Sequence, residues 1–151
     1  MNDRVRDLWA RTRLRVWPEP CYLASLPVES LAAAGEWLSG CGWGFAALVL
    51  ERDEVALTLP ESAWLGSPLR GRALAEAGPL RALSFDLDLD LELVGFLLPA
   101  VERLAAAGIA IIPQCGYLKD HLLVREEKLA DAVRALEELI REMGGAESAA
   151  G

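Results

Sequence analysis

Residues 86–93 read DLDLDLEL, and the chain continues to residue 108 as VGFLLPAVERLAAAG. In the first segment four carboxylates alternate with four leucines, which is the period of a β-strand with one acidic face and one apolar face. The second segment has the apolar spacing of a helix and ends in glycine, a common helix stop. We therefore predict a strand over residues 80–89 that runs directly into a helix over residues 94–107. Pro99 lacks a backbone donor, so it should kink that helix or delay its start.

The acidic row admits three interpretations: the outward face of a sheet, a metal site, or a catalytic pair. On a straight strand successive acids lie about 7 Å apart along a line, whereas a cation needs its oxygens within about 2.5 Å of one point. A carboxylate pair has the spacing of a glycosidase, but the sequence shows no accompanying cleft. We therefore expect the acids to face water or another protein's sheet, with neither metal ligands nor catalytic residues among them.

The chain gives the same order of elements twice. The first set is a strand over residues 14–26, a helix over 28–38, a hairpin of strands 44–50 and 55–59, and a helix over 69–77. The second set is a strand over 80–89, a helix over 94–107, a hairpin of strands 109–117 and 121–125, and a helix over 126–143. The repeated order βαββα predicts an α+β fold of two tandem ferredoxin-like units, each an antiparallel sheet with helices on one face. Each unit lacks one of the usual four strands, which would come from the other half or from a second chain in a dimer.

Composition narrows the class of protein. The chain has 151 residues, of which 53% are hydrophobic, so it can form a core without a metal or a disulfide. A net charge of −8 and a pI near 4.7 argue against a nucleic-acid partner. The first sixteen residues are the exception, because five arginines against two aspartates give +3. This basic segment is short and has no lysine, so we expect a solvated leader or a first helix.

Other classes are disfavoured by what the sequence lacks. Three widely spaced cysteines and a single histidine do not form a zinc pattern, and reduced thiols are expected. No apolar run reaches the roughly 20 residues of a membrane span, and the charged N-terminus does not resemble a signal peptide. We expect a cytoplasmic protein without a cofactor, without a membrane partner and without the usual motifs of an enzyme.

The junction near Gly95 has the features of a small-ligand site. The first amides of a helix are unpaired and attract anions, and glycine allows a ligand to approach the backbone closely. The turn over residues 116–120 brings Lys119 for an anion and Asp120 for an ammonium group, the two charges of an α-amino acid. The alternative is purely structural: Gly95 eases helix packing, and Lys119 and Asp120 are ordinary turn residues. On the residues alone, the structural alternative is the more common outcome.

Residues 83–136, from LSFDLDLDLELVGFLL through AGI and GYLKDH to LLVREE, resemble small bacterial ACT-domain proteins built as two ACT-like halves. Residues 44–62, GFAALVLERDEVALTLPES, resemble the N-terminal half of the same proteins. These proteins are similar to the regulatory domain of aspartokinase and to the animal cytosolic arginine sensor. The resemblance runs from residue 22 to residue 139. It implies an N-terminal ACT-like subdomain (14–79) and a C-terminal ACT domain (80–143). The residues outside these are expected to form an N-terminal arm (1–13) and a disordered tail (144–151).

The resemblance also implies a function and a site. It implies a non-enzymatic regulatory or sensor module that binds an amino acid or a similar small metabolite between the two halves. Carried over by position, the ligand-binding residues are Asp90, Leu91, Glu92, Leu93, Val94, Gly95, Cys115, Gly116, Tyr117, Lys119 and Asp120.

The chain departs from the family pattern at that site. Where the family has small hydroxyl residues, this chain has Glu92 and Val94, and Lys119 replaces a threonine. Glu92 places a negative charge where a ligand carboxylate would lie. The alternative function is therefore a protein–protein interaction module that has lost its ligand. Exposed sheet edges favour pairing, so we expect a homodimer in either case.

Overall fold

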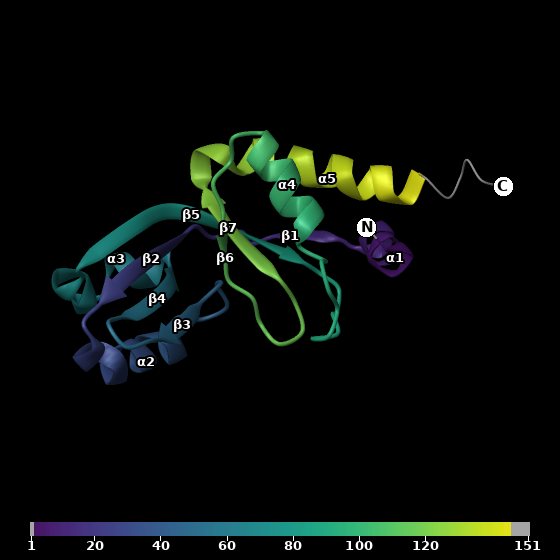
Figure 1. Ribbon diagram of the computed structural model, residues 1–151. Helices are drawn as coiled ribbons and strands as arrows, with labels where there is room; N and C mark the ends of the chain where they lie inside the picture. The colour runs from purple at the N-terminus through teal and green to yellow at the C-terminus, as the bar shows by residue number, and fades with distance from the viewer. Residues whose placement is uncertain (1, 146–151) are drawn as a thin grey trace. The chain divides into compact units, whose positions relative to one another are not determined.

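The computed structural model describes residues 2–145, which form two compact units (Figure 1). The middle unit is residues 17–82. The terminal unit joins the two ends of the chain, up to residue 16 and from residue 83. From the sequence we predicted subdomain boundaries after residues 13, 79 and 143. The two compact units meet after residues 16 and 82. The second of these boundaries lies inside β5 (Ala75–Phe85). Of the predicted tail, Gly144 and Gly145 belong to the last helix, and the rest lies outside the described residues.

The middle unit is a four-stranded antiparallel sheet in the order β3-β4-β2-β5. Its elements are β2 (Cys21–Leu26), η1 (Val28–Ser30), α2 (Leu31–Gly40), β3 (Ala47–Leu50), β4 (Val55–Pro60), α3 (Glu61–Leu65), η2 (Pro68–Arg72) and the first part of β5 (Ala75–Phe85). The alternate residues Val55, Leu57 and Leu59 are fully buried and face one core, which also contains Trp64. This is the predicted ferredoxin-like arrangement, with β5 as its fourth strand.

The predicted helix over residues 69–77 is wrong. Ser67 accepts a hydrogen bond from the Leu69 amide (3.1 Å) and starts a short 3₁₀ segment, after which the chain turns into β5. The Gly78-Pro79 pair that follows lies inside that strand. A Cβ at position 78 would stand 2.4 Å from the Tyr22 ring, so glycine is needed there for space rather than for a turn.

The terminal unit has the same kind of sheet. Its elements are α1 (Asp3–Arg11), β1 (Leu14–Val16), the end of β5, α4 (Leu98–Ala106), β6 (Ile112–Pro113), β7 (His121–Arg125), η3 (Glu126–Lys128) and α5 (Leu129–Gly145). β1 pairs antiparallel with β5. β7 is hydrogen-bonded to β5 as its neighbour in the sheet, and β6 pairs antiparallel with β7. The core of this unit contains Trp9, Phe85 and Phe96 together with buried residues of α4 and α5. The basic N-terminal segment is thus largely a helix with a buried face.

The fourth strand of each sheet comes from the same chain. In the terminal unit it is β1, which precedes the middle unit in sequence and pairs with residues 83–85 of β5. In the middle unit it is the first part of β5, which pairs with β2. Of the two alternatives left open by the sequence, exchange within the chain is the one observed.

The strand predicted to continue through residue 89 ends at Phe85 instead. Residues 86–97 form an irregular connection, and α4 begins at Leu98 with Pro99 in its first turn. The delayed start is what a proline at this position predicts, because its ring fits only the first turn of a helix. Within residues 2–145, none of the helices is long and apolar enough to cross a membrane.

Candidate functional site

The acidic stretch and the turn after β6 are held together by backbone hydrogen bonds. The Leu89 amide donates to the Leu118 carbonyl (2.8 Å), and the Gly116 amide donates to the Lys119 carbonyl (2.9 Å), which closes the turn. At the base of both segments the Phe85 amide donates to the Asp120 carbonyl (3.1 Å). We call residues 86–97 the acidic loop and residues 114–120 the hairpin turn.

A small pocket lies between the acidic loop and the hairpin turn, with a volume of about 120 Å³. The structure brings together seven of the eleven predicted site residues here: Asp90, Leu91, Leu93, Gly116, Tyr117, Lys119 and Asp120. The apolar side chains of Leu89, Phe96 and Leu118 complete the lining. Because these three belong to the core or to the backbone link between the segments, the charge pattern of the sequence did not single them out.

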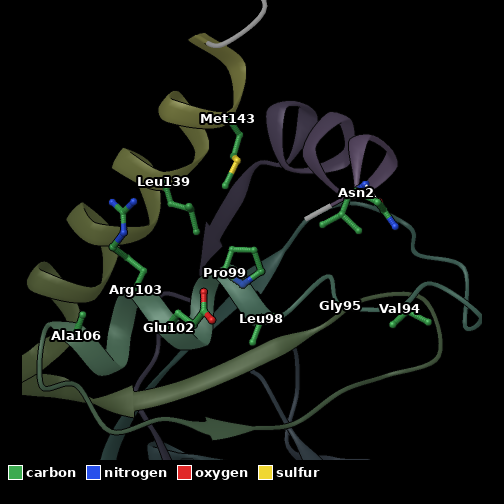
Figure 2. Close-up of a pocket in the computed structure, with 11 residues that line it drawn as sticks. Asn2, Val94, Gly95, Leu98, Pro99, Glu102, Arg103, Ala106, Leu139 and Met143 are labelled. Atoms are coloured by element: carbon green, nitrogen blue, oxygen red, sulfur yellow. Dashed lines mark hydrogen bonds between the residues drawn. The ribbon is translucent and has the colours of Figure 1, made fainter.

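The other four predicted residues lie elsewhere. Val94 and Gly95 line a larger groove beside α4 (Figure 2). Glu92 is exposed, and its amide donates to Asp90 Oδ1 (3.0 Å). Cys115 lies on the hairpin turn but is not among the residues that line the pocket.

The start of α4 offers a ligand fewer amides than the sequence predicted. The Leu98 amide donates to the Gly95 carbonyl (3.4 Å), and Pro99 has no amide hydrogen. The Val101 amide donates to the Leu97 carbonyl (3.0 Å). An anion in the pocket would therefore depend on side chains rather than on this helix end.

The acidic row is not bare, because basic side chains pair with it. Arg15 on β1 contacts Asp86 (3.0 Å), and Lys119 on the hairpin turn contacts both Asp86 (3.5 Å) and Asp88. The pKa of Lys119 is raised, mainly because its ammonium donates a hydrogen bond to Asp88. The positive charge of the N-terminal segment is the sequence signal that could have predicted this pairing.

Asp90 is fixed in the same way at the mouth of the pocket. Its carboxylate accepts hydrogen bonds from the Glu92 amide and from Arg4 of α1 (3.2 Å). These two contacts, the amide first, lower the pKa of Asp90. The ion pair links α1 to the acidic loop, although both side chains are more than half exposed, so its contribution to stability is small.

At the base of the hairpin turn, Cys115 contacts Asp120, and the neighbouring His121 contacts Ser84. Burial raises the pKa of the Cys115 thiol to about 11, and a hydrogen bond to the Asp120 carboxylate acts in the same direction. The thiol is therefore protonated at neutral pH and is a poor nucleophile. His121 Nδ1 lies 2.6 Å from Ser84 Oγ, and burial lowers the pKa of His121. Since Ser84 is only 2% exposed, this pair links two strands rather than offering a reactive hydroxyl.

Among residues 2–145, no three or more histidine, cysteine, aspartate or glutamate side chains converge in a way that could hold a metal ion. The arrangement offers instead one ammonium and two carboxylates around a small cavity. Its chemistry is that of charge recognition.

Comparison with known proteins identifies the class. Residues 76–138 match a family model described as ACT domain, so this part of the chain, from β5 into α5, is an ACT domain. The resemblance inferred from the sequence is confirmed over residues 76–138, and the fold is the predicted ferredoxin-like one. No curated protein matches the chain in sequence.

Solved structures support the same fold. A protein from Agrobacterium tumefaciens is 21% identical with a TM-score of 0.69, and the match covers 89% of this chain and 90% of that one. A possible transport protein of unknown function from Vibrio cholerae is 19% identical with a TM-score of 0.66, over 90% and 95% of the two chains. The ligand-free regulatory subunit of aspartate kinase from Thermus thermophilus is 12% identical with a TM-score of 0.60, over 84% and 97%. At these identities the likeness concerns the fold.

Proposed function

We propose that this protein is a non-enzymatic regulatory module that senses a small cytoplasmic metabolite, with an amino acid as the first candidate. The observation that carries the proposal is the pocket between the acidic loop and the hairpin turn, where Lys119 and two carboxylates, Asp90 and Asp120, surround one cavity. The ACT domain over residues 76–138 supports a regulatory role, as does the fold shared with a regulatory subunit of aspartate kinase.

The size and charge of the pocket define the ligand. A volume of about 120 Å³ equals that of about four water molecules at roughly 30 Å³ each, so the ligand is small. Lys119 would receive a carboxylate, and Asp120 or Asp90 would receive an ammonium group. A small zwitterion satisfies both demands at once.

Binding has to compete with the ion pairs already present. A ligand carboxylate at Lys119 replaces Asp88, and a ligand ammonium at Asp90 competes with Arg4. Binding would therefore loosen the acidic loop from the hairpin turn and from α1. A regulatory module works through such a difference between two states, with a coupling of typically 1–3 kcal/mol.

The test is thermal unfolding in the presence of each of the twenty amino acids at millimolar concentration. A specific ligand at 100 times its dissociation constant adds about 2.7 kcal/mol to the free energy of unfolding. Asp120→Asn should abolish the stabilisation. Asp53→Asn makes the same change in the β3–β4 turn of the middle unit and should not. If none of the amino acids raises the melting temperature, the sensor proposal fails.

A second function is favoured by a specific observation. Around the pocket the side chains of Leu91, Tyr117 and Leu118 are 64%, 76% and 52% exposed. Apolar groups that gather on a surface mark contact with another protein, so the alternative is an interaction module that no longer binds a ligand. We propose a homodimer, with sheet edges such as β3 as the pairing surfaces. Light scattering decides this point, because a dimer has twice the 16.4 kDa mass of the chain.

A further inference from the structure

A second and larger cavity lies in the terminal unit. It is distinct from the small pocket between the acidic loop and the hairpin turn, the loop–turn pocket. It is a groove of about 570 Å³ between α4, α5 and the start of α1. Figure 2 shows Leu139 and Met143 extending from α5 toward the Pro99 ring of α4, with Ala106 at one end of the groove and Val94 at the other. None of the residues that line it lines the loop–turn pocket.

The groove exists because α4 is short. It has 9 residues against the 17 of α5, and residues 94–97 are not helical before it. At 1.5 Å per residue, a helix extended over those four positions would be about 6 Å longer. Leu139 and Met143 lie one turn apart on the same face of α5. Leu139 is buried, whereas Met143 is partly exposed where α4 does not reach.

The lining is apolar apart from Asn2, Glu102 and Arg103. Asn2 and Arg103 already have hydrogen-bond partners. The guanidinium of Arg103 is occupied, because it donates two hydrogen bonds to the Glu142 carboxylate (3.1 and 2.5 Å), which raise the pKa of Arg103. Asn2 caps α1 by accepting a hydrogen bond from the Val5 amide (2.8 Å). Within residues 2–145, the Glu102 carboxylate forms no hydrogen bond and no ion pair, and it lines the groove.

We propose that this groove binds a small amphiphilic cation, with its apolar body against Leu98, Pro99 and Met143, which are exposed or partly exposed, and its ammonium group at Glu102. The volume falls within the range of about 300–1,000 Å³ that is usual for small-molecule sites, which combine apolar walls with a few polar groups that orient the ligand. A neutral molecule of the same shape leaves Glu102 unpaired, and an anion is repelled by it. The site is separate from the proposed sensor pocket and does not depend on it.

The chain offers a convenient probe for the test. It has two methionines, Met1 and Met143, so a sample labelled with ¹³C at the methionine methyl groups gives two signals. Met143→Leu identifies the signal of the groove. We would titrate the full-length protein with 4-phenylbutylamine, 4-phenylbutanol and 4-phenylbutyrate, which share one apolar body and differ in charge. The Met143 signal should move with the amine, which should bind roughly 2- to 5-fold more tightly than the alcohol, and the carboxylate should bind least.

Two substitutions test the role of Glu102. Glu102→Gln should remove the preference for the amine and leave the affinity for the alcohol unchanged. Glu137→Gln changes an exposed glutamate of α5 outside the groove. It lowers the negative charge of the protein by the same amount and should keep the preference. Ala106→Phe should weaken all three probes, with circular dichroism showing that the variant is folded.

Three results would each overturn the proposal. The first is a Met143 signal that none of the probes moves at millimolar concentration. The second is equal affinity for amine, alcohol and carboxylate in the unmodified protein. The third is an equal loss of preference in Glu102→Gln and Glu137→Gln, which would show that the overall negative charge, rather than the groove, attracts the amine.

Discussion

The two units share an order of elements but differ in two connections. In the middle unit, residues 27–30 join β2 to α2, and residues 51–54 join β3 to β4. In the terminal unit the matching connections are residues 86–97 and residues 114–120, and β6 is only two residues long. These two long connections are the acidic loop and the hairpin turn. The repeated elements thus account for the fold, while the length of two connections accounts for the pocket.

The largest effect should come from the residue that anchors the end of the acidic loop. Trp9 is fully buried, stacks on Phe96 with ring centroids 4.9 Å apart, and donates its indole N–H to the Phe96 carbonyl (2.8 Å). Trp9→Ala should lower the free energy of unfolding by about 3–5 kcal/mol, measured by urea unfolding. Trp43→Ala is the control in the middle unit, because Trp43 is 99% exposed, and it should change stability by less than about 0.5 kcal/mol. Equal effects would contradict the role of Trp9.

Two glycines sharpen the comparison, because each unit needs one for a different reason. Gly78→Ala in the middle unit should cost about 1–3 kcal/mol through overpacking against Tyr22, and Tyr22→Ala in the same chain should recover part of that loss. Gly95→Ala in the acidic loop has open space around it but a φ of +86°. It should cost about 1–2 kcal/mol, with no recovery from Tyr22→Ala. Recovery of both variants, or of neither, in urea unfolding would contradict this distinction.

A smaller effect is expected when the competitor for Lys119 is removed. Asp88→Asn breaks the contact with Lys119, so the ammonium is more available to a ligand carboxylate. Once an amino-acid ligand is identified by thermal unfolding, calorimetry should show its affinity rising roughly 2- to 5-fold in this variant. Asp53→Asn in the β3–β4 turn of the middle unit should leave the affinity unchanged. A lower affinity in Asp88→Asn would mean that Asp88 itself contacts the ligand.

The smallest effect concerns pH and reports on the terminal unit alone, since its His121 is the one histidine of the chain. Burial lowers the pKa of His121 in the folded protein, so the unfolded chain binds the proton more readily. Stability should therefore be lost as pH falls below about 6.5, the unfolded value, and regained as pH rises. His121→Asn should flatten the free energy of unfolding between pH 5 and pH 7. A stability that increases on acidification through this window would contradict the assignment.

Much of the fold was predictable where one pattern decided the outcome. The apolar run of Val55, Leu57 and Leu59, which ends at Pro60, predicts β4, and all three side chains are fully buried. The spacing of Leu129, Val133, Leu136 and Ile140 predicts α5 in the same way. The effect of Pro99 on the start of α4 also follows from its own covalent structure.

The candidate site was less predictable because it depends on partners far away in the chain. Leu87 and Leu89 alternate with acids as in a strand, yet the Leu89 amide bonds to Leu118 in the hairpin turn, and Arg15 and Lys119 neutralise Asp86. Periodicity describes one segment at a time, so it could not show that the acidic row is bound by basic side chains. The same limit explains the error at residues 69–77, where Ala75 and Ala77 pair with β2, a strand far away in the sequence.

The pairing of β1 with β5 also bears on how the chain is synthesised and folds. Val16 lies opposite Leu83, so the chain leaves the terminal unit and returns to it at neighbouring positions, and the middle unit is an insertion between them. On the ribosome β1 emerges early but must wait for its partner until the whole insertion has been made. The nascent middle unit can meanwhile form its sheet as far as the first part of β5, whereas α1 and β1 stay unpaired until translation has passed residue 85.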